Sequence, residues 1–140
     1  QEAEMADIAL VTANRVSIVE SIVQMTLPAA EAITAGAIVR LDTATGRFTN
    51  ANASSAAEAR VYGVAARTVV AGAPVTAVRK GVMDGFVLDA LAYDAALYAS
   101  NTDGRMADAA GTTALAVGRV IPGTSSNLGV GYDKLLMIDL

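Results

Sequence analysis

The sequence lacks most of the side chains on which enzymatic and metal sites depend. Its 140 residues contain no Cys, which excludes disulfides and thiolate ligands and gives no indication of redox compartment. They also contain no His, the usual acid–base group near neutral pH. A serine nucleophile would need Lys80 or Lys134 as its base, and the chain has no Ser-x-x-Lys motif. We therefore expect no catalytic residues, no metal site and no cofactor, and we interpret the chain as a protein that is not an enzyme.

Aromatic residues and basic clusters are also scarce. There is no Trp, with only two Phe and four Tyr, and this argues against the exposed aromatic platform of a carbohydrate-binding module. Ten Lys and Arg stand against 14 Asp and Glu, giving a net charge of −4, and Arg79 and Lys80 are the only adjacent basic residues. This balance predicts no nucleic-acid partner. No apolar run reaches the roughly 18 residues of a membrane span, so we expect no membrane partner either.

The composition is apolar but poor in large side chains. Hydrophobic residues make up 54% of the chain, yet 30 of them are alanines, which bury little apolar area. We expect such a chain to gain part of its stability by burying surface against a partner, either in a homo-oligomer or on a docking surface.

One hairpin pattern occurs twice. Residues 38–41 form a β-branched run, residues 42–46 have turn chemistry, and an extended pattern restarts at Arg47. A second version begins at Ala95, and aligning Gly46 with Gly104 gives an offset of 58 residues (104 − 46). Gly63 and Gly118 follow with a similar offset of 55 residues (118 − 63). We predict two related hairpin units, at about 35–70 and 93–121.

The frequent recurrence of glycine and proline favours short strands over helices. Turn signals recur every 8 to 12 residues, which is typical of a β-sandwich or barrel. The high alanine content favours helix, and so does the helix-like spacing of Ile18, Ile22 and Met25, which competes with strand-like alternation in the same segment. Six of the twelve residues from Val16 to Leu27 are β-branched, so we expect a strand there that ends at Pro28. Further strands are expected over 61–70 and 135–140. The predicted fold is an all-β, antiparallel, jelly-roll-like sandwich or barrel, with one domain over 16–140 and an extended N-terminal arm over 1–15.

The arm opens acidic and carries a small apolar patch at Ile8, Leu10 and Val11. Two interpretations remain open at this point. The arm is either a disordered tail or an edge strand of its own domain, or it is a strand lent to a neighbouring subunit through main-chain hydrogen bonds.

The aspartates occur where Asp is expected for backbone reasons. Asp42, Asp103 and Asp108 lie in turn sequences, and Asp84 and Asp89 interrupt apolar runs. We therefore expect turn roles for these residues and not a catalytic carboxylate pair. The segments 42–46 and 101–104 also lack the alternating ligands and the terminal Glu of a calcium loop.

The order and spacing of short segments resemble the head-decoration, or capsid cement, proteins of tailed bacteriophages. The similarity covers the chain from about Met25 to its end, and no single segment is specific by itself. The segments that carry it are residues 25–29, 35–36, 39–42, 46–48, 57–60, 62–63, 79–82, 91–95, 118–122 and 134–136.

The resemblance implies a structural virion protein on the outer surface of the phage head. Such a protein binds the major capsid protein as a homo-oligomer and cements neighbouring capsid subunits against the pressure of packaged DNA. Two-fold closure is the commoner arrangement of homo-oligomers, so a dimer is expected ahead of a trimer. Terminal arms contribute to capsid contacts in this family, which assigns the contact to Ile8, Leu10 and Val11. The alternatives are a phage tail or baseplate β-protein and, more remotely, a carbohydrate-binding module.

Overall fold

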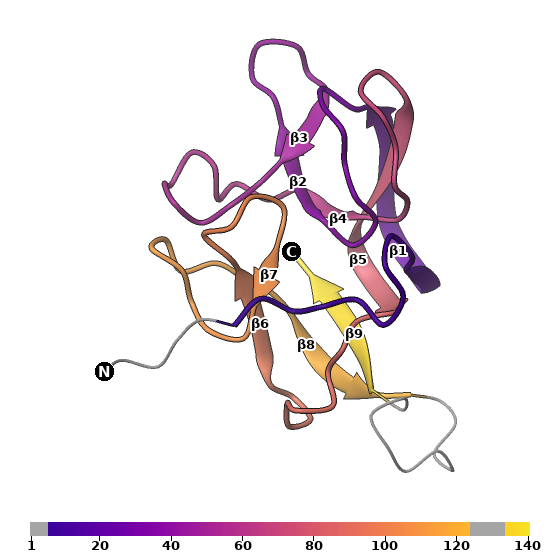
Figure 1. Cartoon of the computed structure of the whole chain (residues 1–140), viewed down its shortest axis with the longest axis vertical. Coiled ribbons are helices and arrows are strands. Elements are labelled where there is room, and N and C mark those ends of the chain that lie inside the picture. Colours follow the sequence, from indigo (N-terminus) through magenta and orange to yellow (C-terminus); the bar gives the residue numbers. More distant parts are fainter. Residues whose placement is uncertain (1–5, 124–133) are drawn as a thin grey trace.

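The computed structural model describes residues 6–123 and 134–140, and these residues form an all-β structure (Figure 1). The described part contains no helix that is long and apolar enough to cross a membrane. The predicted all-β, antiparallel fold is confirmed. The strands are β1 (Ser17–Pro28), β2 (Ile38–Leu41), β3 (Phe48–Asn50), β4 (Gly63–Ala65), β5 (Pro74–Asp84), β6 (Ala96–Ala99), β7 (Met106–Ala107), β8 (Ala116–Pro122) and β9 (Lys134–Asp139).

The strands join one continuous antiparallel sheet. Its order is β3-β2-β4-β5-β9-β8-β6-β7, with β1 paired to β5 outside this path. The sheet curls into a half-barrel, and this is the form that the predicted sandwich or barrel takes. Each of β2 to β5 can be matched with the strand four places later in the chain, so that β2 matches β6 and β5 matches β9. With this matching, the order of strands from one end of the sheet is the same as the order from the other end.

This match makes β5 a member of two equivalent five-strand units, β1–β5 and β5–β9. In the first unit the last strand, β5, pairs antiparallel with the first strand, β1. In the second unit the last strand, β9, pairs in the same way with the first strand, β5. Because β1 runs along β5 from Pro74 to Asp84, the strands β4 and β9 must share the opposite edge of β5. The strand β5 therefore holds the two units together.

Both predicted hairpins form, with matching tips. In the first, the Asp42 N–H donates to the Arg47 carbonyl over 2.7 Å, and in the second the Ser100 N–H donates to the Arg105 carbonyl over 2.9 Å. These two bonds are 58 residues apart in the chain, the offset found in the sequence. Gly46 and Gly104 have φ of 72° and 73°, a left-handed conformation that glycine adopts without a Cβ penalty.

The second pair of glycines marks the point where each unit closes. A Cβ built on Gly63 would lie 2.5 Å from the carbonyl oxygen of Val78 on β5. A Cβ built on Gly118 would lie 2.0 Å from the carbonyl oxygen of Met137 on β9. Both distances are far below van der Waals contact, so glycine permits the close approach of β4 to β5 and of β8 to β9.

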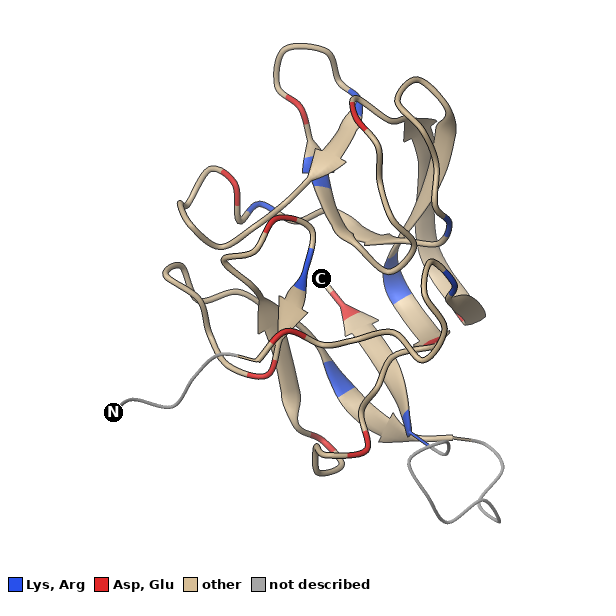
Figure 2. Cartoon of the chain, in the orientation of Figure 1, with Lys and Arg blue, Asp and Glu red and all other residues tan. Residues whose placement is uncertain are grey.

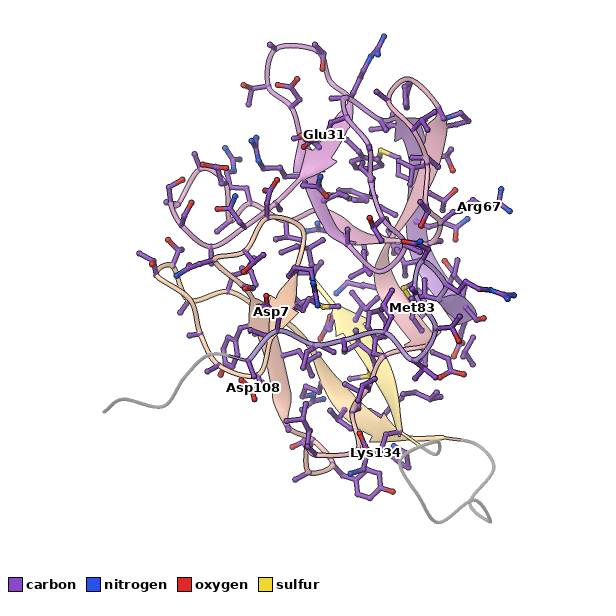
Figure 3. The ribbon with its side chains drawn as sticks, viewed as in Figure 1. Asp7, Glu31, Arg67, Met83, Asp108 and Lys134 are labelled. Carbon is purple, nitrogen blue, oxygen red and sulfur yellow. The ribbon has the colours of Figure 1, made fainter. Side chains whose placement is uncertain are left out.

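Two apolar clusters fill the concave side of the sheet. The larger draws on both units and includes Met83, Leu97 and Leu136, all fully buried (Figure 3). The smaller lies in the first unit around Phe48, whose ring centroid is 5.5 Å from that of Tyr62. Of the 30 alanines, seven are buried members of these clusters: Ala51, Ala53 and Ala99 in the larger, and Ala29, Ala37, Ala65 and Ala77 in the smaller.

The strand expected over 61–70 is much shorter in the structure. Only β4, three residues long, belongs to the sheet. Beyond it the chain turns, and Val69 pairs with Ile33 in an isolated bridge. Val69 thus packs against the smaller cluster from a loop, and Val70 is exposed.

The described part of the arm, from Ala6, lies on its own domain. The Ile8 N–H donates to the Met106 carbonyl over 2.9 Å, and the Asp108 N–H donates to the Ala6 carbonyl over 3.1 Å. Further along, the Val11 N–H donates to the Gly85 carbonyl over 2.8 Å. These hydrogen bonds agree with the interpretation of the arm as an edge strand of its own domain. The arm extends the pairing of β7 and then crosses to the end of β5.

Candidate docking surface

The strand β1 is exposed along almost its whole length. Of its twelve residues only Leu27 is partly covered, and the other eleven are exposed. Large apolar side chains stand open to solvent, with exposed fractions of 70% for Ile22 and 51% for Val19. The exposed apolar side chains of the strand are Ile18, Val19, Ile22, Val23 and Met25. We call these five residues the β1 patch.

The position of β1 in the sheet explains this exposure. It pairs with β5 on one side, and among the described strands none occupies its other edge. Register shifts beside Val19 and Ile22 leave both residues without a partner on β5. Such bulges turn side chains away from the regular alternation, so apolar side chains emerge on both faces of the strand.

Charge does not screen the β1 patch. Glu20 is the single charged residue of β1, although acidic and basic residues are interspersed over the described chain as a whole (Figure 2). Proteins that remain monomeric usually blunt an edge strand with lysine, proline or very short length. The outer strands β3 and β7 are three and two residues long, whereas β1 is twelve residues long and apolar.

The three arm residues predicted to make contacts lie in different environments. Ile8 is buried in the larger core cluster of its own chain. Leu10 is partly buried and packs against the same cluster. Val11 is 61% exposed. Of the three, Val11 alone presents most of its surface to solvent.

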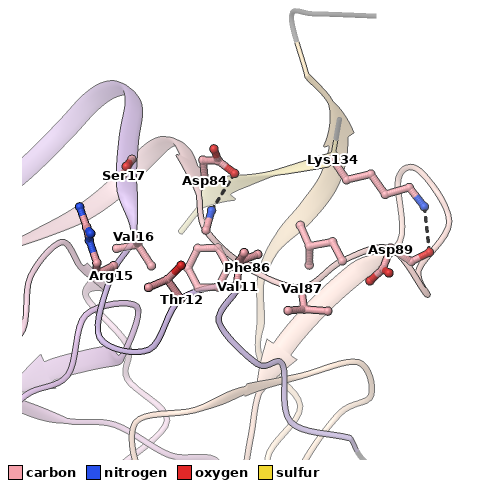
Figure 4. Close-up of a pocket in the computed structure, with 12 residues that line it drawn as sticks. Val11, Thr12, Arg15, Val16, Ser17, Asp84, Phe86, Val87, Asp89 and Lys134 are labelled. Carbon is pink, nitrogen blue, oxygen red and sulfur yellow. Dashed lines mark hydrogen bonds between the residues drawn. The ribbon is translucent and has the colours of Figure 1, made fainter. Parts of the chain in front are cut away.

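An open pocket of about 700 Å³ lies beside Val11. The arm from Val11 to Ser17 forms one wall, and the segment from Asp84 to Asp89 forms the other (Figure 4). Phe86 lies in this second wall, and Lys134 stands at the rim, where its Nζ donates to the carbonyl oxygens of Asp89 and Leu91. The pocket lining is therefore mixed, with an apolar middle and charged ends.

The carboxylates singled out in the sequence are used in local hydrogen bonds. Asp42 accepts from the Ala44 N–H and from the Thr45 hydroxyl, and the Thr45 hydroxyl is the main reason why its pKa is lowered. Asp103 accepts from the Asn52 side chain over 3.0 Å. Asp108 accepts from the Ala6 N–H over 3.0 Å, close to Asp7 in the arm (Figure 3).

Asp84 accepts from the N–H of the next residue, Gly85, and the carboxylate of Asp89 lines the open pocket. The expected turn role is thus seen for Asp42 in particular. Over residues 6–123 and 134–140, no group of three or more Asp and Glu is arranged to hold a metal ion.

Glu31 has a role that the sequence did not indicate. Its carboxylate accepts from the Thr49 hydroxyl over 2.5 Å and from the Asn50 N–H over 3.1 Å, so it ties the loop after β1 to β3. These hydrogen bonds, with the nearby charge of Arg40, lower the pKa of Glu31 despite its partial burial. Glu31 is thus a structural carboxylate (Figure 3).

The β1 patch was also missed from the sequence. The strand itself was predicted, but the exposure of its apolar residues was not. The missed signal is that apolar residues occur at both odd and even positions, in Ile18, Val19, Ile22 and Val23, a pattern of strands covered on both faces. In this chain nothing among the described residues supplies the second cover.

Comparison with protein-family models, with curated proteins and with solved structures gives no match for this chain.

Proposed function

We propose that this chain is a structural protein of a tailed-phage virion. It binds the outer surface of the assembled head and cements neighbouring major capsid proteins, without catalysis. The proposal starts from the resemblance in segment order, and the all-β fold agrees with it. The observation that carries it is the large apolar surface left open on β1, because soluble single chains rarely leave such a surface uncovered.

The mechanism is mass action. A protein that binds the assembled shell and not its free subunits stabilises the shell by about 2.7 kcal/mol per site at a free concentration of 100 times Kd. Copies that bridge subunit boundaries multiply this effect, because each boundary must then open against a clamp. The net charge of −4 suits an outer surface better than one that faces DNA.

Co-sedimentation with emptied, expanded heads, and separately with tails, tests the proposal. We expect saturable binding to heads in a fixed ratio to the major capsid protein, and a raised temperature of head rupture. Absence of binding to heads would overturn the proposal. Binding to tails alone would favour the tail or baseplate protein instead.

A matched pair of variants tests the arm contact. Val11→Asp places a charge on the exposed arm residue, and Val70→Asp places the same charge on a loop residue that is 71% exposed. If the arm contacts the capsid, Val11→Asp weakens head binding about tenfold or more, since an interface that buries an unpaired carboxylate loses affinity, and Val70→Asp leaves binding unchanged. Equal binding by both variants would remove the arm from the contact.

A further inference from the structure

We infer that the open edge of β1 pairs with β1 of a second copy of this chain, antiparallel and across a two-fold axis. The inference rests on the proposed function in so far as a homo-oligomer is part of it. To the proposed function it adds the open edge of β1 as the surface, a second copy as the partner, and the antiparallel direction of pairing. The two equivalent units of the fold support it.

The molecule itself shows what fits at this edge. In the second unit, β5 takes the place that β1 has in the first, since each is the first strand of its unit. The edge of β5 that is not used by β4 and β9 is covered by an antiparallel strand, and that strand is β1. The corresponding edge of β1 is open. An antiparallel β1 from a second copy would repeat at this edge the pairing that β1 already makes with β5.

The sequence of β1 suits antiparallel pairing with itself. With Ile22 on the two-fold axis, Glu20 of one copy faces Gln24 of the other, and Val19 faces Met25. Ile18 then faces Thr26, and Val23 faces Ser21. The two Glu20 carboxylates are then four residues apart along the ribbon. A parallel pair in register would set Glu20 beside Glu20, which costs free energy. Charge thus favours the antiparallel arrangement.

The strand is long enough to hold such a dimer. Twelve residues at the rise of an extended strand span about 40 Å. Pairing over this length satisfies the free main-chain groups of the edge and covers five apolar side chains in each copy. Two-fold pairing through identical patches also closes the assembly at two copies, so the edge does not propagate into a fibre.

The first test is the mass of the isolated chain, measured by sedimentation equilibrium from about 1 to 100 μM. We expect twice the 14.2 kDa chain mass. Ile22→Lys, which sets two like charges together at the axis, should raise the Kd of the dimer about a hundredfold or more. The control is Leu41→Lys at the end of β2, an exposed apolar residue on a different strand, which should leave the Kd unchanged.

A monomer at 100 μM overturns the inference, and so does a trimer, because an antiparallel two-fold pair admits two copies only. An Ile22→Lys variant that dimerises like the parent chain overturns it as well. The circular dichroism spectrum of each variant shows whether it is folded. Because Ile22 is 70% exposed in the single chain, its replacement should not disturb the fold.

Introduced cysteines test the direction of pairing, since the chain has no others. Ile22→Cys places two thiols at the axis, and we expect a disulfide-linked dimer on mild oxidation. Ser17→Cys places two thiols ten residues apart along the ribbon, about 33 Å, and should not cross-link. Rapid cross-linking at residue 17 would overturn the antiparallel pairing, and so would its absence at residue 22.

These outcomes are separate from those of head binding. A chain that is monomeric yet binds heads overturns only the pairing through β1. A dimer that binds neither heads nor tails overturns only the proposed function.

Discussion

The units β1–β5 and β5–β9 share one arrangement of strands but differ in how their first strand is covered. In the second unit that strand is β5, which has neighbours on both edges and buried residues along its length. In the first unit it is β1, which has one neighbour and is exposed on both faces. The same structural position is thus core in one unit and surface in the other. Because each first strand depends on another strand to cover it, the repeat leaves β1 uncovered.

The largest loss of folding stability is expected at the two glycines that permit close strand approach, one in each unit. Gly118→Ala would place a Cβ 2.0 Å from the Met137 carbonyl oxygen, and Gly63→Ala would place one 2.5 Å from that of Val78. We expect each to lower the free energy of unfolding by about 3 kcal/mol or more, because a backbone atom of the neighbouring strand must move. Urea denaturation measures this loss.

Gly46→Ala is the control for these two variants. Its Cβ would meet no atom within 4 Å, so only the left-handed φ of 72° costs free energy, about 1 kcal/mol. If Gly118→Ala lowers the free energy of unfolding no more than Gly46→Ala does, then the close approach of β8 to β9 does not require glycine at position 118.

The arm provides the next largest effect, since Ile8 packs in the cluster that both units share. Ile8→Ala removes a side chain buried in the larger cluster and should lower the free energy of unfolding by about 3 kcal/mol. Val11→Ala alters an exposed side chain of the same arm and should change it by less than about 0.5 kcal/mol. Thermal unfolding of both variants measures the difference. An equally small effect at residue 8 would mean that the arm does not pack on the domain.

The equivalent hairpin tips should respond differently to truncation. Ser100 is buried, accepts from the Thr102 N–H and donates to the Asp7 carboxylate in the arm, so Ser100→Ala should cost about 2 kcal/mol. Asp42 has the same place in the first tip and accepts from the Ala44 N–H and the Thr45 hydroxyl, but it is only half-buried and all its partners lie within the tip. Asp42→Ala should therefore leave the melting temperature almost unchanged. A larger loss of stability for Asp42→Ala than for Ser100→Ala would contradict a stabilising role of the hydrogen bond between Ser100 and Asp7 of the arm.

The smallest effect is a pH dependence confined to the first unit. The pKa of Glu31 lies below its ordinary value of 4.5, chiefly because of the Thr49 hydroxyl. A lowered folded-state pKa gives stability that is complete above pH 4.5 and is lost as the pH falls through the folded-state pKa. Glu31→Gln should cost about 1 kcal/mol at pH 7 and should weaken this acid dependence. Denaturation from pH 3 to 7 measures both.

Asp139→Asn is the control for this variant. Asp139 also has a lowered pKa, through its 2.5 Å pair with Lys80, but both side chains are exposed and solvent screens the pair. Its replacement should change the acid dependence less than that of Glu31. The reverse order would place the acid-sensitive contact at β9 instead of β3.

The sequence was sufficient for β1 and for the two hairpin tips, because local chemistry decides them, but not for the strand expected over 61–70. β-Branched residues located β1, and the turn residues around Gly46 and Gly104 located both tips. Features that depend on distant pairing could not be obtained in this way. The crossing of Gly118 over Met137 and the hydrogen bonds of Glu31 to β3 join segments 18 or more residues apart. The exposure of β1 was missed because apolar residues at both odd and even positions indicate that both faces are covered but not which chain covers them.

The shared strand β5 has a consequence for the order in which the protein is made. Residues 17–84 contain all five strands of the first unit, so this unit has its partners as soon as β5 leaves the ribosome. The second unit must wait for β9, which is synthesised after β5 to β8 and joins an edge of β5 that is already in place. We therefore expect folding during translation to proceed from the amino-terminal unit, with the first unit acting as the template on which the second is completed.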